Sequence, residues 1–180
     1  MVSRDRVVVV GAGLAGLQTV AALRDVGYDG VLTLVGEEAH PPYDRPPLSK
    51  AVLSGEAEDS TLDAAWGDWG VDLRLGCTAT GLREGVVCTD AGDLDWDRLV
   101  IATGSTPIRF PGTQAAVTLR TREDSAHVRR FLAPGARIAI VGAGWIGAEV
   151  ATAAVRAGAE VTVVEALAAP LANALPRECG

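Results

Sequence analysis

Residues 6–16, taken together with Glu37, constrain the fold of this chain more than any other feature. Four valines at positions 7–10 precede Gly11-Ala12-Gly13-Leu14-Ala15-Gly16, and an apolar helical pattern follows through Leu23. This order predicts a buried strand, a tight glycine turn and a helix. Glycines suit the turn because one permits the bend, one lets the backbone approach a pyrophosphate, and one allows helix and strand to pack closely.

An acidic residue follows at the spacing of a dinucleotide site. Residues 31–35 predict a second strand, and Glu37 comes 26 positions after Gly11, where a carboxylate can accept hydrogen bonds from a ribose. The helix N-terminus offers free N–H groups and partial positive charge to phosphates. A lone G-x-G-x-x-G is weak evidence, but strand, turn, helix, strand and acid together predict a dinucleotide site. Its candidate residues are Gly11, Gly13, Leu14, Ala15, Gly16 and Glu37.

The same pattern returns 131 residues later. Residues 137–141 predict a strand, residues 148–157 a helix, and residues 161–164 a strand ending at an acid. The candidate residues of this second motif are Gly142, Gly144, Ile146, Gly147 and Glu165. Two such motifs indicate one site for a flavin dinucleotide and one for the nicotinamide nucleotide that reduces it. The alternative is a structural duplicate without a ligand.

The segment after Glu165 bears on the choice of nicotinamide nucleotide. Glu165 is placed to accept hydrogen bonds from both ribose hydroxyls, and residues 166–169 contain no arginine for a 2′-phosphate. NADH is therefore favoured over NADPH.

The region between the two motifs predicts short elements. Pro46 and Pro47 suit the first turn of a short helix that Gly55 ends. A second short helix is expected over residues 61–69, and Thr121 is expected to cap a helix reaching Leu132, with Asp124 in the capping-box position. Four strands predict an antiparallel insertion, at residues 71–75, 78–83, 86–89 and 94–96. Residues 99–102 then restore a buried parallel strand.

Composition limits the classes of partner. The 180 residues are 48% hydrophobic, enough for a real core, and the formal net charge of −7 argues against nucleic acid and anionic membrane surfaces. No apolar stretch is long enough for a transmembrane helix, and the glycines at 11, 13 and 16 disfavour a signal peptide. Three scattered cysteines, Cys77, Cys88 and Cys179, predict reduced, buried thiols in a cytoplasmic protein. None of the candidate residues is assigned to a metal.

Lys50 and Glu149 stand out by their rarity. Lys50 is the only lysine among sixteen lysines and arginines, which indicates a need for a compact ammonium; the alternative is a solvated surface lysine. Glu149 is the only charge between Trp145 and Val155, on a predicted helix that is apolar all round. Because a buried carboxylate needs a partner, the two are expected to pair.

The whole chain closely resembles the FAD-dependent ferredoxin or rubredoxin reductases of the pyridine nucleotide-disulfide oxidoreductase superfamily, which serve cytochrome P450 and Rieske oxygenase systems. The resemblance rests on the first glycine motif and on further segments: 35–38, 42–50, 102–104, 119–121 with 123–124, and 142–149, which contains the second glycine motif. Arg45-Pro46-Pro47-Leu48-Ser49-Lys50 is the most family-specific of them.

The resemblance implies a role for each matching residue. It places the FAD pyrophosphate at Gly13–Ala15, the adenosine ribose at Glu37, and the flavin against Arg45 and Lys50. It implies adenine contacts at the Ala79 backbone and further FAD contacts in the Ala102-Thr103-Gly104 segment and at Arg120. Lys50 and Glu149 would form the catalytic pair beside the flavin N5, where hydride arrives.

The resemblance also implies how electrons leave the flavin. Disulfide reductases of the superfamily keep a C-x-x-x-x-C pair near the first helix, and related oxidases keep one cysteine where this chain has Pro42-Tyr43. Neither cysteine pattern is present. Electrons are therefore expected to pass directly to an iron-sulfur carrier of the ferredoxin or rubredoxin type.

The expected fold is α/β. Residues 1–112 are assigned to a Rossmann-like FAD-binding domain with an antiparallel insertion, lacking its C-terminal return segment. Residues 113–180 are assigned to the first βαβ unit of a second Rossmann-like NAD(P)-binding domain, with the chain stopping inside its next helix. Two hypotheses follow: the N-terminal part of an NADH-dependent ferredoxin reductase, or a truncated, non-catalytic nucleotide-binding fragment that needs self-association or a partner chain.

Overall fold

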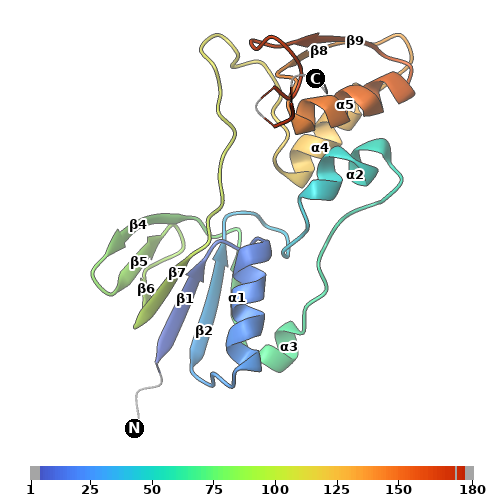
Figure 1. Cartoon of the computed structure of the whole chain (residues 1–180). Helices are drawn as coiled ribbons and strands as arrows, with labels where there is room; N and C mark the ends of the chain where they lie inside the picture. Colours follow the sequence, from blue (N-terminus) through green and yellow to red (C-terminus); the bar gives the residue numbers. More distant parts are fainter. Residues whose placement is uncertain (1–4, 173, 177–180) are drawn as a thin grey trace. The chain divides into compact units, whose positions relative to one another are not determined.

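The computed structural model describes residues 5–172 and 174–176, which form two compact units. One unit combines residues 5–44 with 61–105, and the other combines residues 45–60 with the chain from 106 onward. The elements of each unit can be followed in Figure 1. The assignment of residues 1–112 to an FAD domain and 113–180 to a nicotinamide domain stays a prediction.

A parallel sheet forms the centre of the first unit. It contains β1 (Arg6–Val10), β2 (Val31–Gly36), β3 (Asp72–Leu75) and β7 (Arg98–Ile101) in the order β3-β2-β1-β7, and all three pairings are parallel. The valine run of β1 is explained by burial on both faces, because Val7 and Val9 pack into one cluster and Val8 and Val10 into another. The α/β class and the parallel sheet are confirmed.

Two different layers cover the faces of this sheet. The helices α1 (Leu14–Asp25) and α3 (Trp66–Trp69) lie on the side of Val9, where Val20 and Leu34 are fully buried. The antiparallel strands β4 (Ala79–Arg83), β5 (Val86–Thr89) and β6 (Leu94–Asp95) form the predicted insertion, and Val87 packs with Val8 on the other side. Figure 1 shows α1 and this three-stranded sheet on opposite sides of β1.

Two sequence predictions are wrong in this unit. The strand near residues 71–75 was expected in the antiparallel insertion, but β3 pairs in parallel with β2, with Asp72 opposite Thr33. The helix expected over residues 61–69 contains only α3. Thr61 instead forms an antiparallel bridge with Tyr43, and the Leu62 N–H donates to the Pro42 carbonyl at 2.9 Å. This extended pairing delays the helix until Trp66.

The second unit contains the predicted βαβ repeat. The strands β8 (Arg137–Val141) and β9 (Glu160–Val164) pair in parallel and are joined by α5 (Trp145–Arg156). The 3₁₀ helix η1 (Pro46–Ser49) leads into α2 (Ala51–Ser54), which ends at a left-handed Gly55 as expected. Both η1 and α2 pack against α5 and against α4 (Arg122–Arg129).

The predicted cap of α4 is confirmed. The Thr121 hydroxyl accepts the Asp124 N–H at 3.2 Å, and the Asp124 carboxylate accepts the Thr121 N–H at 3.0 Å. The helix ends three residues before Leu132, because the N–H groups of Phe131 and Leu132 bond three residues back in tighter turns. The expected helix at the end of the chain reaches residues 177–180, which lie outside the described residues, as does Cys179.

The described helices are short. The longest, α1 and α5, have 12 residues each, and none in the described part of the chain combines the length and apolar character needed to cross a membrane.

Candidate functional site

The first glycine loop is held by contacts that only glycine permits. Gly11 has φ +115°, and a Cβ at this position would lie 2.1 Å from the Ala102 carbonyl oxygen. The Ala102 N–H in turn donates to the Val10 carbonyl at 2.7 Å. A Cβ at Gly16 would lie 1.9 Å from the Gly11 oxygen. The structure therefore brings Ala102 and Thr103 against this loop, and their contact with FAD stays a prediction.

Gly13 leaves open space at the start of α1. A Cβ added there meets no heavy atom within 4 Å, and α1 has neither a side-chain cap nor an acidic residue in its first turn. Leu14 and Ala15 are exposed, so the first N–H groups of the helix are open to an anion. This arrangement fits the pyrophosphate of a dinucleotide.

Glu37 lies next to this loop because of the residue before it. A Cβ at Gly36 would lie 2.5 Å from the Ala12 Cβ, so the end of β2 approaches the loop closely. Glu37 follows and is exposed, which leaves its carboxylate accessible to a ribose.

The second glycine loop repeats this geometry. Gly142 has φ +101°, a Cβ at Gly147 would lie 2.1 Å from the Gly142 oxygen, and a Cβ at Gly144 meets nothing within 4 Å. The helix α5 likewise begins without a side-chain cap or an acidic residue in its first turn, and Ile146 there is exposed. By contrast, the capping box of Thr121 and Asp124, together with Glu123, occupies the start of α4. The two glycine motifs therefore share an anion-accepting helix end that α4 lacks.

Glu165 faces the second loop. Its Oε2 accepts the Ala143 N–H at 2.6 Å, and its Oε1 accepts the Leu167 N–H at 2.9 Å. These N–H groups of Leu167 and Ala143 lower the pKa of Glu165 below its ordinary value. A carboxylate has about four lone-pair positions, so two oxygens that each hold one N–H can still accept ribose hydroxyls.

We expect the contact between Glu165 and Ala143 to depend on pH. Because the pKa of Glu165 is lower in the folded chain than in the unfolded chain, the contact is fully present above the ordinary glutamate range and is lost as the pH falls through the folded pKa. The Ala143 amide resonance, followed by NMR during acid titration, should report this loss. In Glu165→Gln, which keeps an uncharged acceptor, the acid response should disappear. An equal response in both proteins would contradict the assignment.

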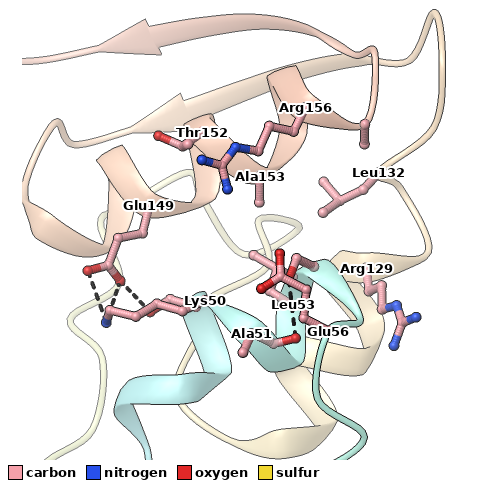
Figure 2. Close-up of a pocket in the computed structure, with 13 residues that line it drawn as sticks. Lys50, Ala51, Leu53, Glu56, Arg129, Leu132, Glu149, Thr152, Ala153 and Arg156 are labelled. Atoms are coloured by element: carbon pink, nitrogen blue, oxygen red, sulfur yellow. Dashed lines mark hydrogen bonds and ion pairs between the residues drawn. The ribbon is translucent and has the colours of Figure 1, made fainter.

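The predicted pair of Lys50 and Glu149 is present in the second unit. The Lys50 Nζ lies 3.0 Å from Glu149 Oε1 and 3.1 Å from Oε2. The same ammonium donates to the Pro46 carbonyl at 3.1 Å. Figure 2 shows the Glu149 side chain extending from α5 toward Lys50 at one end of a hollow of about 520 Å³, which α2, α4 and α5 line.

The environment of Glu149 differs from the expected one in its degree of burial. Its side chain is 27% exposed and that of Lys50 is 52% exposed, and α5 buries only Val150 and Ala154, so the helix is not covered all round. Partial burial acts to raise the pKa of Glu149, but hydrogen bonds from Ser49 and Lys50 and the charge of Lys50 outweigh it and lower the pKa below its ordinary value. The carboxylate is therefore held ionised.

Two residues near the predicted site were missed from the sequence. The Ser49 hydroxyl donates to Glu149 Oε2 at 2.5 Å, and Ala143 supplies the N–H that Glu165 accepts. The only signal for Ser49 was its place beside Lys50 in the Arg45–Lys50 segment.

The remaining candidates are placed as follows. The Arg45 guanidinium donates to the Arg120 carbonyl at 2.8 Å, so these two predicted residues lie together in the second unit. Gly104 lies two residues after Ala102, the residue that contacts the first glycine loop, and it has φ +73°. Ala79 begins β4 in the antiparallel sheet, and its contact with adenine stays a prediction.

Comparison with known proteins gives consistent matches along the chain. The family model for pyridine nucleotide-disulphide oxidoreductases matches residues 5–180. The ferredoxin–NAD(+) reductase subunit of a benzene 1,2-dioxygenase system from Pseudomonas putida is 41% identical over 187 residues, covering 98% of this chain and 45% of that relative. The crystal structure of Fdr9 is 52% identical with a TM-score of 0.94, covering 98% of this chain and 45% of that chain.

A covalent complex of putidaredoxin reductase with putidaredoxin is a further solved neighbour. It is 37% identical with a TM-score of 0.90, covering 96% of this chain and 45% of that chain. The chain thus spans about 45% of the length of these relatives. Matched over residues 5–180, the chain belongs to the pyridine nucleotide-disulphide oxidoreductase family.

Proposed function

We propose that this chain corresponds to the N-terminal part of an NADH-dependent flavoprotein reductase that passes electrons through FAD to a ferredoxin or rubredoxin of a P450 or Rieske oxygenase system. The observation that carries the proposal is that the glycine loop occurs twice. Each of the two loops is followed by a helix without a side-chain cap and then by a strand that an acidic residue follows. Bound FAD would accept a hydride and release single electrons, the chemistry that such a carrier requires.

In this proposal, different residues of the chain bind FAD, bind NADH and carry charge beside the flavin. Gly13 and the first N–H groups of α1 bind the FAD pyrophosphate, and Glu37 orients its ribose. Gly144 and α5 do the same for NADH, with Glu165 on the adenosine ribose. Lys50 and Glu149 would place a pair of opposite charges beside the flavin, where hydride would arrive. Preorganised charge of this kind needs no reorganisation during the reaction.

The choice of NADH and of compartment is part of the proposal. Glu165 accepts ribose hydroxyls and repels a 2′-phosphate, and residues 166–169 contain no arginine, which supports NADH over NADPH. Cys77 and Cys88, the cysteines among the described residues, are both free thiols, which supports a reducing, cytoplasmic setting.

The proposal predicts a yellow protein that NADH bleaches. We expect the purified chain to carry FAD, and anaerobic NADH to reduce it faster than NADPH at equal concentration. The reduced protein should then reduce a [2Fe–2S] ferredoxin, followed by its visible spectrum. A chain that binds FAD but shows no bleaching would contradict the reductase assignment.

That outcome would favour the second candidate, a nucleotide-binding fragment without catalysis. One observation supports it. Val141, Val163 and Val164 are 65%, 41% and 54% exposed on the β8–β9 pair, and within the described residues this sheet has two strands. The helix α5 packs against both strands, but the exposed valines still leave apolar surface in water, which self-association or a partner chain would cover.

A further inference from the structure

The Ser49 hydroxyl is a second side-chain donor to the Glu149 carboxylate, beside the Lys50 ammonium. Ser49 is 6% exposed, and its Oγ lies 2.5 Å from Glu149 Oε2. It is the last residue of η1, and Lys50 interrupts the helical turn with φ −121° and ψ −110° before α2 begins. This interruption accompanies an arrangement in which two consecutive side chains bond the same carboxylate.

The two donors differ in how firmly they are fixed. Lys50 is a flexible side chain, half exposed to solvent, and it shares its ammonium between Glu149 and the Pro46 carbonyl. Ser49 is buried and has a single rotatable side-chain bond, so it loses little conformational freedom when it binds. The position of Oε2 is therefore set mainly by the hydroxyl, while Lys50 supplies most of the charge.

Other charged groups near Glu149 do not replace this hydroxyl. Arg156 of α5, Arg129 of α4 and Glu56 after α2 line the same hollow, and Figure 2 shows their side chains around it. Within the described part of the chain, the side-chain donors recorded on the Glu149 carboxylate come from Ser49 and Lys50. Removing the Ser49 hydroxyl would leave Oε2 with the half-exposed Lys50 ammonium as its side-chain donor among the described residues.

We propose that Ser49 is a positioning residue that fixes the Glu149 carboxylate for hydride transfer beside the flavin. This inference rests on the proposed reductase function. The hydroxyl also has a second acceptor, since Ser49 Oγ lies 3.4 Å from the Pro46 carbonyl. When Glu149 is protonated, the hydroxyl can donate to Pro46 and accept a hydrogen bond from the neutral carboxyl group. While the Glu149 carboxylate is ionised, the Ser49 hydroxyl thus favours the orientation in which Oε2 accepts its hydrogen bond.

A carboxyl NMR titration tests the hydrogen bond without any cofactor. In the ¹³C-glutamate-labelled chain, Ser49→Ala should raise the pKa of Glu149, because the bond to Ser49 stabilises the ionised form. The matched control is Ser54→Ala, whose hydroxyl lines the same hollow but donates to the Ala51 carbonyl. This control should leave the Glu149 titration unchanged. An unshifted pKa in Ser49→Ala, or an equal shift in both variants, would overturn the inference.

Flavin reduction tests the positioning role. With FAD bound, Ser49→Ala should slow reduction by saturating NADH about tenfold, since small displacements of an oriented group can cost up to ~10²-fold, and the acid limb of the pH profile should move to higher pH. In a Glu149→Gln background, the same replacement should have no further effect. An equal slowing in both backgrounds would overturn the role. Wild-type protein without bleaching would reject the proposed function, while the NMR titration would still decide the hydrogen bond.

Discussion

Replacing Gly16 with alanine is expected to lower the free energy of unfolding of the first unit by about 3 kcal/mol. The new Cβ would lie 1.9 Å from the Gly11 carbonyl oxygen and 3.1 Å from the Leu34 side chain. Alanine in a helix gains about 1 kcal/mol over glycine, but α1 and β1 would have to separate to relieve a backbone clash of this size. The clash therefore outweighs the helix propensity.

Gly13→Ala is the matched control. Its Cβ meets no atom within 4 Å, and Gly13 has φ −95°, so the free energy of unfolding should change by less than about 0.5 kcal/mol. FAD affinity should nevertheless fall, because the methyl group occupies the approach of the pyrophosphate. Urea unfolding followed by tryptophan fluorescence suits this unit, since Trp66, Trp69 and Trp96 lie in it. Equal midpoints for Gly16→Ala and wild type would contradict the packing argument.

Lys50→Met is expected to slow reduction of bound FAD by NADH about 10–100-fold while FAD stays bound. The ammonium contacts both oxygens of Glu149, so its loss leaves a partly buried carboxylate with Ser49 as its one side-chain donor among the described residues. The FAD pyrophosphate would be bound by Gly13 and α1, and its affinity should change less than twofold. Anaerobic stopped-flow absorbance measures the first effect, and fluorescence titration with FAD measures the second.

Two further variants separate charge from geometry. The Arg156 guanidinium lines the same hollow, but within the described residues it forms no bond to Glu149. The Arg156→Met variant should therefore reduce flavin at the wild-type rate. Lys50→Arg keeps the charge but replaces a compact ammonium with a planar guanidinium, and it should fall between wild type and Lys50→Met. Hydride transfer at the wild-type rate in Lys50→Met would reject the catalytic assignment.

Local pattern was sufficient where strand, turn and helix follow one another directly. Gly11 and Gly142 sit at positive φ as their motifs require, and Thr121 with Asp124 forms the expected box. The pattern failed where a distant segment decides. Nothing within residues 71–75 reveals that β3 pairs in parallel with β2 and does not belong to the antiparallel insertion. The start of the expected helix at Thr61 is instead extended, because Thr61 forms a bridge with Tyr43, far away in the sequence.

In the candidate site, too, the sequence predicted some contacts but not those that depend on distant segments. The rarity of Lys50 and the isolation of Glu149 in an apolar helix were enough to pair them across the sequence, because an unpaired carboxylate is costly to bury. Their degree of exposure was not predictable, since it depends on how α2 and α4 pack against α5. Ser49 carried no pattern of its own, because serine is common and its bond to Glu149 exists only in the folded chain.

The grouping of residues 45–60 with the chain after 106 bears on how the protein is made. Ser49 and Glu149 are 100 positions apart, so at a synthesis rate of about 5–20 residues per second the acceptor leaves the ribosome about 5–20 s after the donor. The strands of the first unit end at Ile101 and can pair before then, with residues 45–60 looped out. The segment that carries Lys50 therefore emerges early but can reach its partners only after residues 122–156 have been made.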